Sequence, residues 1–468
     1  LKLRLQLARH IKTLAPPSTM LALIVQSAAA FHATTRSAAA FHVTTRPGVC
    51  GRAGAAVMQQ KDEAGSMRTR PLGASGIMVS ELGLGTQRWG GTDFNSPDEK
   101  TCHAMLDLAT EAGVNLVDTA ESYPIPSGRG KNAEGATEAI LGSWMAKDKA
   151  RREKLVIASK ITGGGNVTPR NLERDLEGTL KRLGTDYLDV YLLHWPARYT
   201  PQANWGQSLE YGHMQGEVSQ SGTTSFTEIA EAMGSLVKAG KIRGWGMCND
   251  NAYGLMGSLG AARALGVEGP CVMQNDYSLI NRRVEENGLS EASAPWNEDV
   301  GFMGYNALAG GVLTGKYLDV PAATDDTNRV RSMASSLKPR GRMDEKGWGR
   351  TLYRYRSGPA DEATRAYAQI AEEAGLSLTE LSLKWCRSRA ACTTTLLGQS
   401  SLPQLIEGLG HFAAPPLVEY DNGFTQYLPE EVLWEIDRVH MRNRLPIFSS
   451  TRVGAEWDGR GEIGEPVP

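Results

Sequence analysis

Residues 113–123 read GVNLVDTAESY, and the rest of the chain can be interpreted outward from this stretch. Its apolar residues Val114, Leu116 and Val117 suit a strand that is buried on both faces. Asp118 ends that strand, and a carboxylate at such a position costs free energy unless a cation or a hydrogen-bond donor meets it. The stretch therefore predicts a buried strand that runs into a functional turn, with a tyrosine five residues after the aspartate.

Two later apolar segments also end in a polar side chain. LVIASK ends at Lys160, and LDVYLLHW carries His194 near its end. Taken singly, such residues are ordinary, because an aspartate after a strand usually belongs to a turn or a helix cap, a lysine there is usually solvated, and a lone histidine is usually structural. In a parallel α/β barrel, however, the carboxyl ends of all strands converge on one mouth. The three strand ends together predict one site with an aspartate, a lysine, a histidine and a tyrosine.

The chain alternates short apolar segments with helical patterns, which is typical of repeated βα units. Strands are expected near residues 81, 114, 155, 187, 242, 271, 301 and 394. Helices are expected at 98–112, 133–147, 170–183, 225–239, 251–265, 283–294, 361–375 and 402–410. Eight such units in about 340 residues predict an α/β fold, a single (β/α)8 TIM barrel.

Additional segments decorate the predicted barrel. Residues 67–80 hold turn-forming glycines and predict an N-terminal hairpin that plugs the bottom of the barrel. Long loops are expected after strand four, at Ala197–Ser225, and after strand seven, at Tyr317–Gly358. Because both loops follow the carboxyl ends of strands, we expect them to cover a substrate or a cofactor.

Composition excludes several classes of protein. The 468 residues are 41% hydrophobic, which suffices for a globular core, and the apolar run from Met20 to Ala30 is too short to span a membrane. Residues 1–60 contain no acidic and seven basic residues, so the rest of the chain carries a net charge of −9, which argues against nucleic acid as a partner. The six cysteines show no CxxC pair and no metal-ligand spacing, which indicates a reduced compartment without a structural metal.

The first 66 residues have the composition of a targeting sequence. They are rich in Ala, Ser, Thr and Arg and repeat one decapeptide, as SAAAFHATTR at 27–36 and SAAAFHVTTR at 37–46. Phenylalanines placed after an apolar segment that starts at Met20 resemble the bipartite plastid presequences of algae with secondary plastids, and Met20 is then the expected start. A mitochondrial presequence and a basic cytoplasmic tail are the alternatives. We expect residues 1–66 to be a presequence, 67–440 the barrel domain, and 441–468 a poorly ordered tail.

Three separated motifs, VDTAESY, IASK and LLHWP, stand in the order that the aldo-keto reductases show on successive strands. The chain resembles this family from Arg68 to His440. The segments YPIP, REKLVIASK, KRLGTDYLDVYLLHWP and YNALAGGVLTGKY are similar to the branch that holds bacterial Tas-like reductases and the potassium-channel β-subunits. The resemblance implies a barrel enzyme that reduces aldehydes or ketones with a nicotinamide dinucleotide.

The resemblance also implies roles for the residues at the strand ends. Carbonyl reduction needs a hydride donor and a proton donor, and Tyr123 is the expected general acid. A free phenol has a pKa of about 10, so a value of about 7 needs about 4 kcal/mol of preferential stabilisation of the phenolate. The Lys160 ammonium would supply it, Asp118 would hold that ammonium charged and oriented, and His194 would place or polarise the carbonyl oxygen.

The expected cofactor is NADPH, with NADH not excluded. It is inferred from the resemblance, because the chain has no P-loop and no strand-linked GxGxxG. The contacts implied along the dinucleotide, from the nicotinamide ribose to the adenosine, are Gly85, Thr86, Cys248, Asn249, Gln274, Tyr305, Asn306, Leu308, Gly310, Lys316, Gly398, Ser400, Gln404 and Glu407. The expected partner is a small carbonyl compound, and its identity and the oligomeric state stay open.

The chain departs from the family pattern at several of these places. Cys248 replaces a usual serine, Asn306 and its neighbour replace a usual Ser-Pro, and Gly408 replaces a usual asparagine on the adenine side. No Lys or Arg lies between residues 397 and 408, where many relatives hold the 2′-phosphate of NADPH. Arg329 or Arg331 in the second long loop could supply that charge.

Two other functions stay open alongside the reductase. The channel-subunit branch uses the same architecture as a dinucleotide-sensing regulatory subunit with weak or no turnover, and it carries asparagine where this chain has His194. The complete set of four residues therefore favours an enzyme. A Schiff-base aldolase with Lys160 as its nucleophile would leave Tyr123 and the cofactor motifs unexplained.

Overall fold

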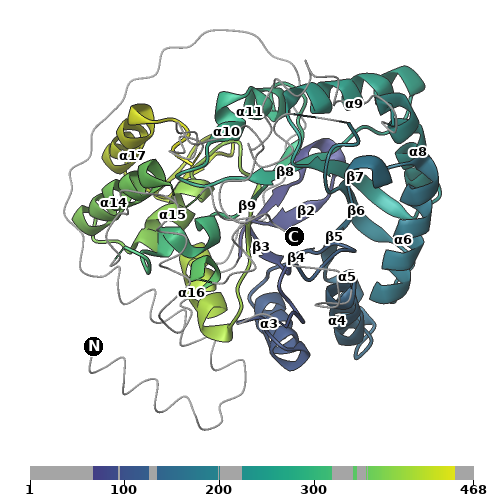
Figure 1. Ribbon diagram of the computed structural model, residues 1–468, viewed down its shortest axis with the longest axis horizontal. Helices are drawn as coiled ribbons and strands as arrows, with labels where there is room; N and C mark the ends of the chain where they lie inside the picture. The colour runs from purple at the N-terminus through teal and green to yellow at the C-terminus, as the bar shows by residue number, and fades with distance from the viewer. Residues whose placement is uncertain are drawn as a thin grey trace, which may run out of the picture.

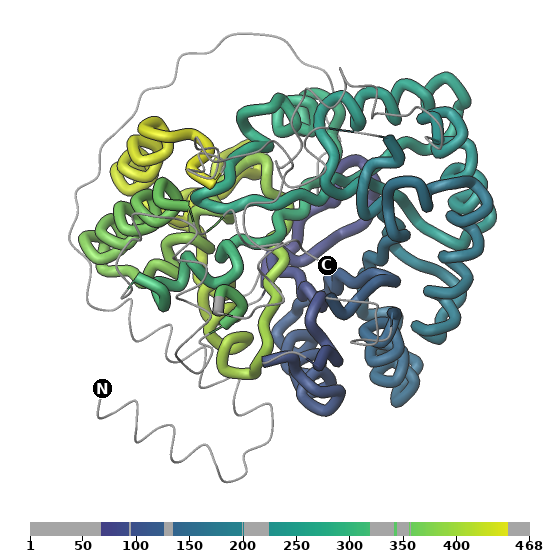
Figure 2. The backbone as a smooth tube through the Cα atoms, viewed as in Figure 1, coloured from purple at the N-terminus to yellow at the C-terminus, as the bar shows by residue number. Residues whose placement is uncertain are grey.

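The computed structural model describes residues 67–92, 95–125, 134–198, 200, 224–318, 341–344, 355 and 357–447. The predicted presequence, most of both long loops with Arg329 and Arg331, and residues 448–468 lie outside these ranges. Figure 1 shows strands at the centre of a ring of helices. In Figure 2 the colour advances steadily around this ring, so the chain winds once around the barrel.

Eight parallel strands close into a barrel, which confirms the predicted TIM barrel. They are β3 (Leu82–Gly85), β4 (Leu116–Asp118), β5 (Val156–Ile161), β6 (Leu188–Leu193), β7 (Ile242–Cys248), β8 (Val272–Asp276), β9 (Gly301–Tyr305) and β10 (Thr394–Leu397). Each strand pairs with the next in chain order, and β10 closes the barrel by pairing with both β9 and β3. The short apolar runs in the sequence are these strands, because a barrel strand is covered on its inner face by other strands and on its outer face by helices.

Helices pack around the outside of the barrel. They are α3 (Glu99–Glu111), α4 (Ala136–Met145), α5 (Ala150–Glu153), α6 (Pro169–Leu183), α8 (Phe226–Lys238), α9 (Ala252–Leu265), α10 (Arg283–Glu286), α11 (Leu289–Ser293), α14 (Gly358–Glu373), α15 (Leu378–Arg387), α16 (Leu402–Ala413) and α17 (Glu430–Arg442). Local chemistry sets their ends. Thr168 caps α6 by accepting a hydrogen bond from the Asn171 N–H, and Gly184 ends the same helix at a left-handed φ of 69°. Ser225 and Glu228 form a capping box at the start of α8.

Several helix predictions need correction. The helix expected at 283–294 is two short helices, α10 and α11, because Gly288 adopts a left-handed φ of 77° between them. The patterns did not predict α15 and α17, although Ser377 caps α15 and acidic residues lie in the first turn of α17. Helix α17 ends at Arg442, two residues after the expected boundary at residue 440, and the domain boundaries stay a prediction.

Alternation along the strands decides which side chains reach the interior of the barrel. On β5, Ala158 belongs to an interior cluster, whereas Ile157 packs outward with the residues that face the helices. Two residues beyond Ala158 on the same face lies Lys160. The same alternation places Asp118 two residues after the interior Leu116 of β4, and His194 two residues after the interior Leu192 of β6. The strand period therefore places all three predicted site residues on the inner face at the carboxyl end of the barrel.

The expected hairpin is present beside the amino-terminal ends of the strands. It consists of β1 (Thr69–Pro71), a 3-10 turn η2 (Gly73–Ser75) and β2 (Met78–Ser80), with the two strands antiparallel. Its Leu72, Ile77 and Val79 share the interior cluster with barrel residues. The N–H of Ala74 also donates to the carbonyl of Asp299, just before β9, at 2.9 Å. Its function as a plug stays a prediction.

A buried ion cluster lies at the same end of the barrel. Glu81, which is 3% exposed, accepts hydrogen bonds from Arg70 Nε at 2.8 Å, Arg387 Nη2 at 2.9 Å and Tyr427 Oη at 3.0 Å. Burial alone would raise the pKa of Glu81, but the two guanidinium groups lower it to about 2. We call these four residues the lower ion cluster. It joins the hairpin, the first barrel strand, α15 and the segment that follows β11 (Val418–Glu419) and β12 (Thr425–Gln426).

Two features are absent from the residues that the structure describes. None of the helices in these ranges has the length and hydropathy of a membrane span. No group of three or more His, Cys, Asp or Glu side chains in the same ranges could hold a metal ion.

Candidate active site

Lys160 is locked in place inside the mouth of the barrel. Its Nζ donates to the two carboxylate oxygens of Asp118, at 2.7 and 2.8 Å, and to the carbonyl oxygen of Thr119 at 2.8 Å. The lysine side chain is fully buried, and Asp118 is 3% exposed. Three short hydrogen bonds to oxygen satisfy all three donors of the ammonium, so β4 and β5 hold its charge in one position.

Tyr123 and His194 complete the group around this lysine. The phenol oxygen of Tyr123, in the turn after β4, lies 3.5 Å from Lys160 Nζ. The imidazole of His194, directly after β6, meets the tyrosine ring edge to face, with centroids 5.7 Å apart and planes at 74°. The structure thus brings together all four residues predicted as catalytic. We call Asp118, Lys160, Tyr123 and His194 the upper polar cluster.

Burial and the ion pair set two of the protonation states in this cluster. Burial alone would lower the pKa of Lys160, but the Asp118 carboxylate raises it above its ordinary value, so the lysine is charged. Burial lowers the pKa of His194 well below its ordinary value, and the Lys160 charge acts in the same direction. The imidazole is therefore neutral at neutral pH and can donate one hydrogen bond without carrying charge.

The expected lowering of the Tyr123 pKa is wrong for this structure. Burial of the phenol, which is 6% exposed, raises its pKa to about 12, and the opposing effect of Lys160 does not overcome it. The reason is geometric, because Asp118 balances the ammonium charge from 2.7 Å while the phenol oxygen lies farther away, at 3.5 Å. Tyr123 therefore holds its proton until negative charge develops beside it.

A hydrogen-bonded chain extends from the upper polar cluster to the ends of β7 and β8. Gln274 Nε2 donates to Asp118 Oδ2 at 2.7 Å, and Gln274 Oε1 accepts from the Cys248 thiol at 3.5 Å. Asn249 Nδ2 in turn donates to Cys248 Sγ at 3.2 Å and to the carbonyl of His194 at 2.9 Å. Burial raises the pKa of the Cys248 thiol, which keeps it a neutral donor. Three residues predicted at the nicotinamide end thus contact one another and residues predicted as catalytic.

Strands β3 and β9 add the remaining residues predicted at this end. The Tyr305 hydroxyl donates to Asn249 Oδ1 at 2.5 Å, and Asn249 itself has a left-handed φ of 59°, which asparagine tolerates better than most residues. Thr86 donates its N–H and its hydroxyl to the backbone carbonyl of Asp118, at 3.1 and 2.8 Å. Gly85 pairs with Asp118 across the two strands. All of these residues border the same mouth.

The model of the aldo/keto reductase family matches residues 81–424, which is well over half of the chain. The protein tas of Escherichia coli (strain K12) is similar over 387 residues at 35% identity, covering 80% of this chain and 97% of tas. The chain belongs to the aldo-keto reductase family.

Other relatives agree with this assignment. An aldo-keto reductase of Babesia bovis is 30% identical over 306 residues, which cover 63% of this chain and 98% of that protein. The uncharacterized oxidoreductase YrpG of Bacillus subtilis (strain 168) is 29% identical over 345 residues, which cover 71% of this chain and 87% of YrpG. Membership of the family makes the protein an oxidoreductase that acts on small carbonyl compounds.

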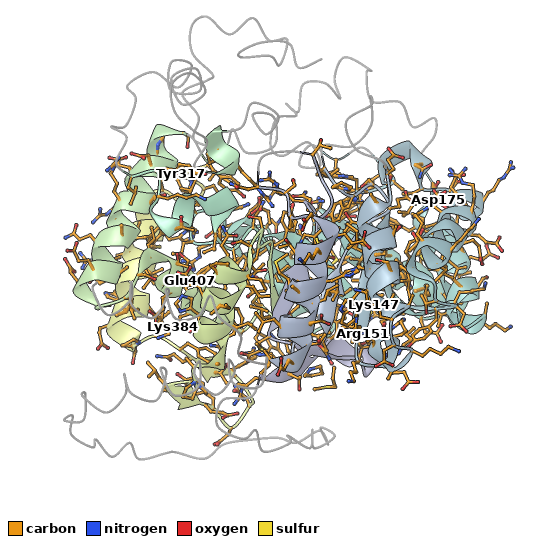
Figure 3. All side chains as sticks on the ribbon, turned by 90° about the horizontal axis from the view of Figure 1, so that it is seen from below. Lys147, Arg151, Asp175, Tyr317, Lys384 and Glu407 are labelled. Carbon is orange, nitrogen blue, oxygen red and sulfur yellow. The ribbon has the colours of Figure 1, made fainter. Side chains whose placement is uncertain are left out.

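In this aldo-keto reductase, the segment after β9 holds the next group of predicted contacts. Asn306 Nδ2 lies 3.5 Å from both Asp276 Oδ2 and Tyr355 Oη. Leu308 is the N-cap of the 3-10 segment η4 (Ala309–Thr314), in which Gly310 has a φ of 65°, and Lys316 follows two residues after its end. In Figure 3, Tyr317 of this segment lies on the upper side, whereas Lys147 and Arg151, which precede β5, lie on the lower side. The mouth of the barrel therefore faces upward in that view.

The residues predicted at the adenosine end lie at β10 and α16. Gln404 Oε1 accepts from the N–H and hydroxyl of Ser400, at 2.9 and 3.2 Å. Glu407 lies one helical turn further along, with Oε1 3.9 Å from His411 Nε2. Gly398 stands between β10 and this helix. These four residues form a second group, separate from the hydrogen-bonded chain at the nicotinamide end.

Two contacts at the mouth escaped the sequence patterns. Arg342 lies in η5 (Arg342–Asp344) of the second long loop and packs against Gly398. A Cβ placed on that glycine would lie only 3.3 Å from Arg342 Nη2. Arg198 donates two hydrogen bonds to the Asp250 carboxylate, at 2.6 and 2.9 Å, and so joins the loop after β6 to the loop after β7. No local pattern marks either residue, since each contact joins segments that are distant in sequence.

Proposed function

We propose that this aldo-keto reductase is an NADPH-dependent enzyme that reduces aldehydes or ketones to alcohols, with Tyr123 as the general acid. The observation that carries the proposal is the upper polar cluster, in which a protonated phenol, a charged lysine and a neutral imidazole meet at the mouth of a barrel. A reaction that turns a carbonyl into an alkoxide needs such donors around one oxygen atom.

Each residue of the cluster has a distinct part in this reaction. The chemistry that a reduced dinucleotide supplies when bound is hydride transfer to the carbonyl carbon. As charge develops on the carbonyl oxygen, the phenol of Tyr123 transfers its proton to that oxygen, and the Lys160 ammonium stabilises the resulting phenolate. The neutral imidazole of His194 donates a hydrogen bond to the same oxygen. Asp118 and Gln274 hold the ammonium in place.

The raised pKa of Tyr123 is compatible with this part. A general acid must be protonated before the reaction, and a phenol with a pKa of about 12 is protonated throughout the physiological range. Its acidity is needed only in the transition state, when an alkoxide with a still higher proton affinity lies beside it. Lys160 then acts on the phenolate rather than on the resting phenol.

NADPH is preferred over NADH on the basis of charge at the adenosine end. The loop from Gly398 to Gly408 contains no Lys or Arg of its own, but Arg342 places its guanidinium against Gly398. Ser401, the N-cap residue of α16, makes no side-chain capping hydrogen bond, which leaves the start of this helix suited to an anion. Arg342 is our candidate for this charge, and the candidates Arg329 and Arg331 lie outside the described residues. Replacing Arg342 by Met should weaken NADPH binding and leave NADH binding nearly unchanged.

A regulatory subunit that senses dinucleotides with little turnover is the alternative function. His194 favours the enzyme, because a second hydrogen-bond donor beside Tyr123 has a use in catalysis and none in sensing alone. A Schiff-base aldolase is disfavoured, because Lys160 is charged and its three donors are engaged, whereas such a nucleophile must be a neutral amine.

The deciding experiment is NADPH oxidation with a panel of aldehydes, ketones and quinones. Turnover with any of them supports the reductase. Dinucleotide binding without turnover on the whole panel would favour the regulatory subunit. Absence of dinucleotide binding would contradict both functions.

We propose in addition that residues 1–66 direct the protein to a plastid, on the strength of the repeated alanine-rich decapeptides and the absence of acidic residues up to residue 60. N-terminal sequencing of the protein from its native source should place the mature start between residues 47 and 66. Retention of residues 21–45 would remove the argument for targeting.

A further inference from the structure

The segments that follow β6 and β7 are joined by an ion pair between Arg198 and Asp250. Arg198 Nη1 and Nη2 donate to Asp250 Oδ2 and Oδ1, at 2.9 and 2.6 Å. The two side chains are 18% and 3% exposed, and Asp250 Oδ1 also accepts from the N–H of Asn251 at 2.8 Å. A planar guanidinium that uses two donors fixes the orientation of a carboxylate as well as its distance. We call this pair the Arg198–Asp250 fork.

The surroundings of the fork hold both of its side chains in place. The guanidinium carbon of Arg198 lies 5.3 Å from the ring centroids of Phe226 and Tyr253. A Cβ on Gly254 would lie 2.3 Å from both carboxylate oxygens of Asp250. Gly254 is inside α9 and its φ is not left-handed, so the backbone there does not require glycine. Glycine lowers the stability of a helix, and at this position it makes room for the carboxylate.

The fork closes a ring that contains His194. Arg198 stands four residues after His194, and Asp250 directly follows Asn249. Asn249 Nδ2 donates to the carbonyl of His194 at 2.9 Å. Covalent bonds and hydrogen bonds therefore lead from His194 through Arg198, Asp250 and Asn249 back to His194. Breaking the fork opens this ring and leaves the segment after β6 with fewer restraints.

His194 depends on such restraints of its backbone. Among the residues that the structure describes, none forms a hydrogen bond with its imidazole, which meets the ring of Tyr123 at 5.7 Å and that of Trp195 at 6.1 Å. Aromatic contacts persist over centroid distances of about 4.5 to 7 Å, so they leave the imidazole room to shift. A hydrogen bond weakens steeply when its angle is poor. A small displacement of the backbone would therefore spoil a hydrogen bond from this imidazole.

We infer that Arg198 and Asp250 are positioning residues, whose fork holds His194 where its imidazole donates to the carbonyl oxygen of the substrate. This inference rests on the proposed reductase function, and it gives a part in that function to two residues outside the upper polar cluster. Since the fork acts through His194, its loss lowers kcat only while the imidazole is present. A fork that served stability alone would lower the unfolding temperature and leave kcat of the folded protein unchanged.

Kinetics of Arg198→Met in the full chain, with and without His194→Ala, test the inference. Methionine keeps an apolar chain against the two aromatic rings and removes the fork. In the presence of His194, kcat should fall about tenfold or more, because a displacement of about 1 Å can cost about 10²-fold. In the His194→Ala background, the same change should alter kcat less than about twofold, as expected when one residue acts through another. Single turnovers with enzyme in excess measure the slow variants, and calorimetry checks dinucleotide binding.

Two further variants control for folding. Arg198→Met leaves the Asp250 carboxylate buried without its cation, so Arg198→Met with Asp250→Asn, which buries no unpaired charge, decides if the single variant does not fold.

Arg152→Met is the matched control at the other end of the barrel. Arg152 Nη2 donates to Asp189 Oδ2 at 2.9 Å, its side chain is 12% exposed, and its guanidinium lies 3.8 Å from the ring centroid of Tyr187. The pair resembles the fork in chemistry and burial, but it joins α5 to the amino-terminal end of β6. Its loss should lower the unfolding temperature and leave kcat unchanged in both backgrounds.

The outcomes separate the inference from the proposed function. A fall in kcat that disappears in the His194→Ala background, and that Arg152→Met does not reproduce, supports the inference. Wild-type kcat in the folded fork variants, or an equal fall in both backgrounds, would show that the fork does not act through His194, and the reductase function would stand. If wild type turns over none of the carbonyl compounds in the panel, the proposed function fails and the inference fails with it.

Discussion

The two ends of the barrel each bury a carboxylate, and they treat it differently. At the amino-terminal end, Glu81 bonds to Arg70, Arg387 and a tyrosine hydroxyl, and Arg68 Nε lies 3.8 Å from it, so three positive charges surround one negative charge. At the carboxyl end, Asp118 meets one cation, Lys160, and the neutral amide of Gln274, so the charges balance one to one. The lower ion cluster therefore lowers the pKa of its carboxylate to about 2, whereas in the upper polar cluster burial prevails and raises the pKa of Asp118. The pKa of the neighbouring phenol rises as well, to about 12.

This difference separates stability from function. Arg70, Arg387 and Tyr427 all bond to the Glu81 carboxylate, and they join segments from both ends of the domain sequence. The upper polar cluster instead satisfies its ion pair internally and leaves the phenol of Tyr123 and the imidazole of His194 beside the mouth. Such a division is general in TIM barrels, whose amino-terminal face serves stability and whose carboxyl face carries the chemistry. Matched substitutions at the two ends should therefore affect different quantities.

The largest difference should come from removing one tyrosine hydroxyl at each end. Tyr123→Phe keeps the ring and should lower kcat by about 10²- to 10⁴-fold, the usual contribution of a general acid, with fold and dinucleotide affinity retained. Tyr427→Phe should leave kcat unchanged and cost about 1 kcal/mol of unfolding free energy. Steady-state kinetics and urea unfolding measure the two effects. Near wild-type kcat in Tyr123→Phe would remove it as the acid.

The next effect concerns stability at the lower end. Glu81→Gln leaves the buried Arg387 and the half-buried Arg70 without their carboxylate and should cost about 3 to 5 kcal/mol of unfolding free energy, with kcat of the folded protein unchanged. Because the folded pKa of about 2 lies below the ordinary value near 4.5, wild type should lose this stabilisation as the pH falls from 4.5 towards 2, and the variant should not. Urea unfolding at several pH values measures both.

Glu419→Gln is the control for this prediction. Glu419 pairs with Arg68 at 2.8 Å but its side chain is 41% exposed, so its removal should change the unfolding free energy by less than about 1 kcal/mol. Equal losses in Glu81→Gln and Glu419→Gln would show that burial does not distinguish the two pairs.

A smaller effect is the coupling inside the upper polar cluster. Lys160→Met and Asp118→Asn should each lower kcat, but the double variant should lose less than the two losses combined, because Asp118 acts by holding Lys160. The expected coupling is about 0.5 to 3 kcal/mol, the range for residues in one network. A double-mutant cycle on kcat measures it. Additive losses would indicate that Asp118 has a part independent of the lysine.

The smallest expected effect is on the pH dependence, because neither Tyr123 nor His194 should titrate near neutral pH. The pKa of Tyr123 is raised to about 12 and that of His194 is lowered well below its ordinary value, so neither group changes protonation between pH 7 and 10. The value of kcat/KM, which reports ionisations of the free enzyme, should be flat over this range. A fall with a midpoint below pH 10 that disappears in Tyr123→Phe would show that Lys160 lowers the phenol pKa after all.

Much of the fold and part of the site could be predicted from the sequence. The strand alternation carries Asp118, Lys160 and His194 to the inner face without any tertiary information, because side chains along a strand alternate by geometry alone. Helix α15 was also within reach, since Ser377 followed by Glu380 is a helix-start pattern. The break at Gly288 was not, because a glycine inside a helical pattern is compatible with both a helix and an interruption.

The sequence by itself determined the barrel, the residues at its mouth and the family, because these depend on periodicity and on motifs that are local in the chain. Only the tertiary structure decided the direction of the Tyr123 pKa and the position of Arg342 against Gly398. The physical reason is the same in both cases. Desolvation, charge balance and packing space are set by neighbours that are distant in sequence, and folding alone brings those neighbours within a few ångströms of each other.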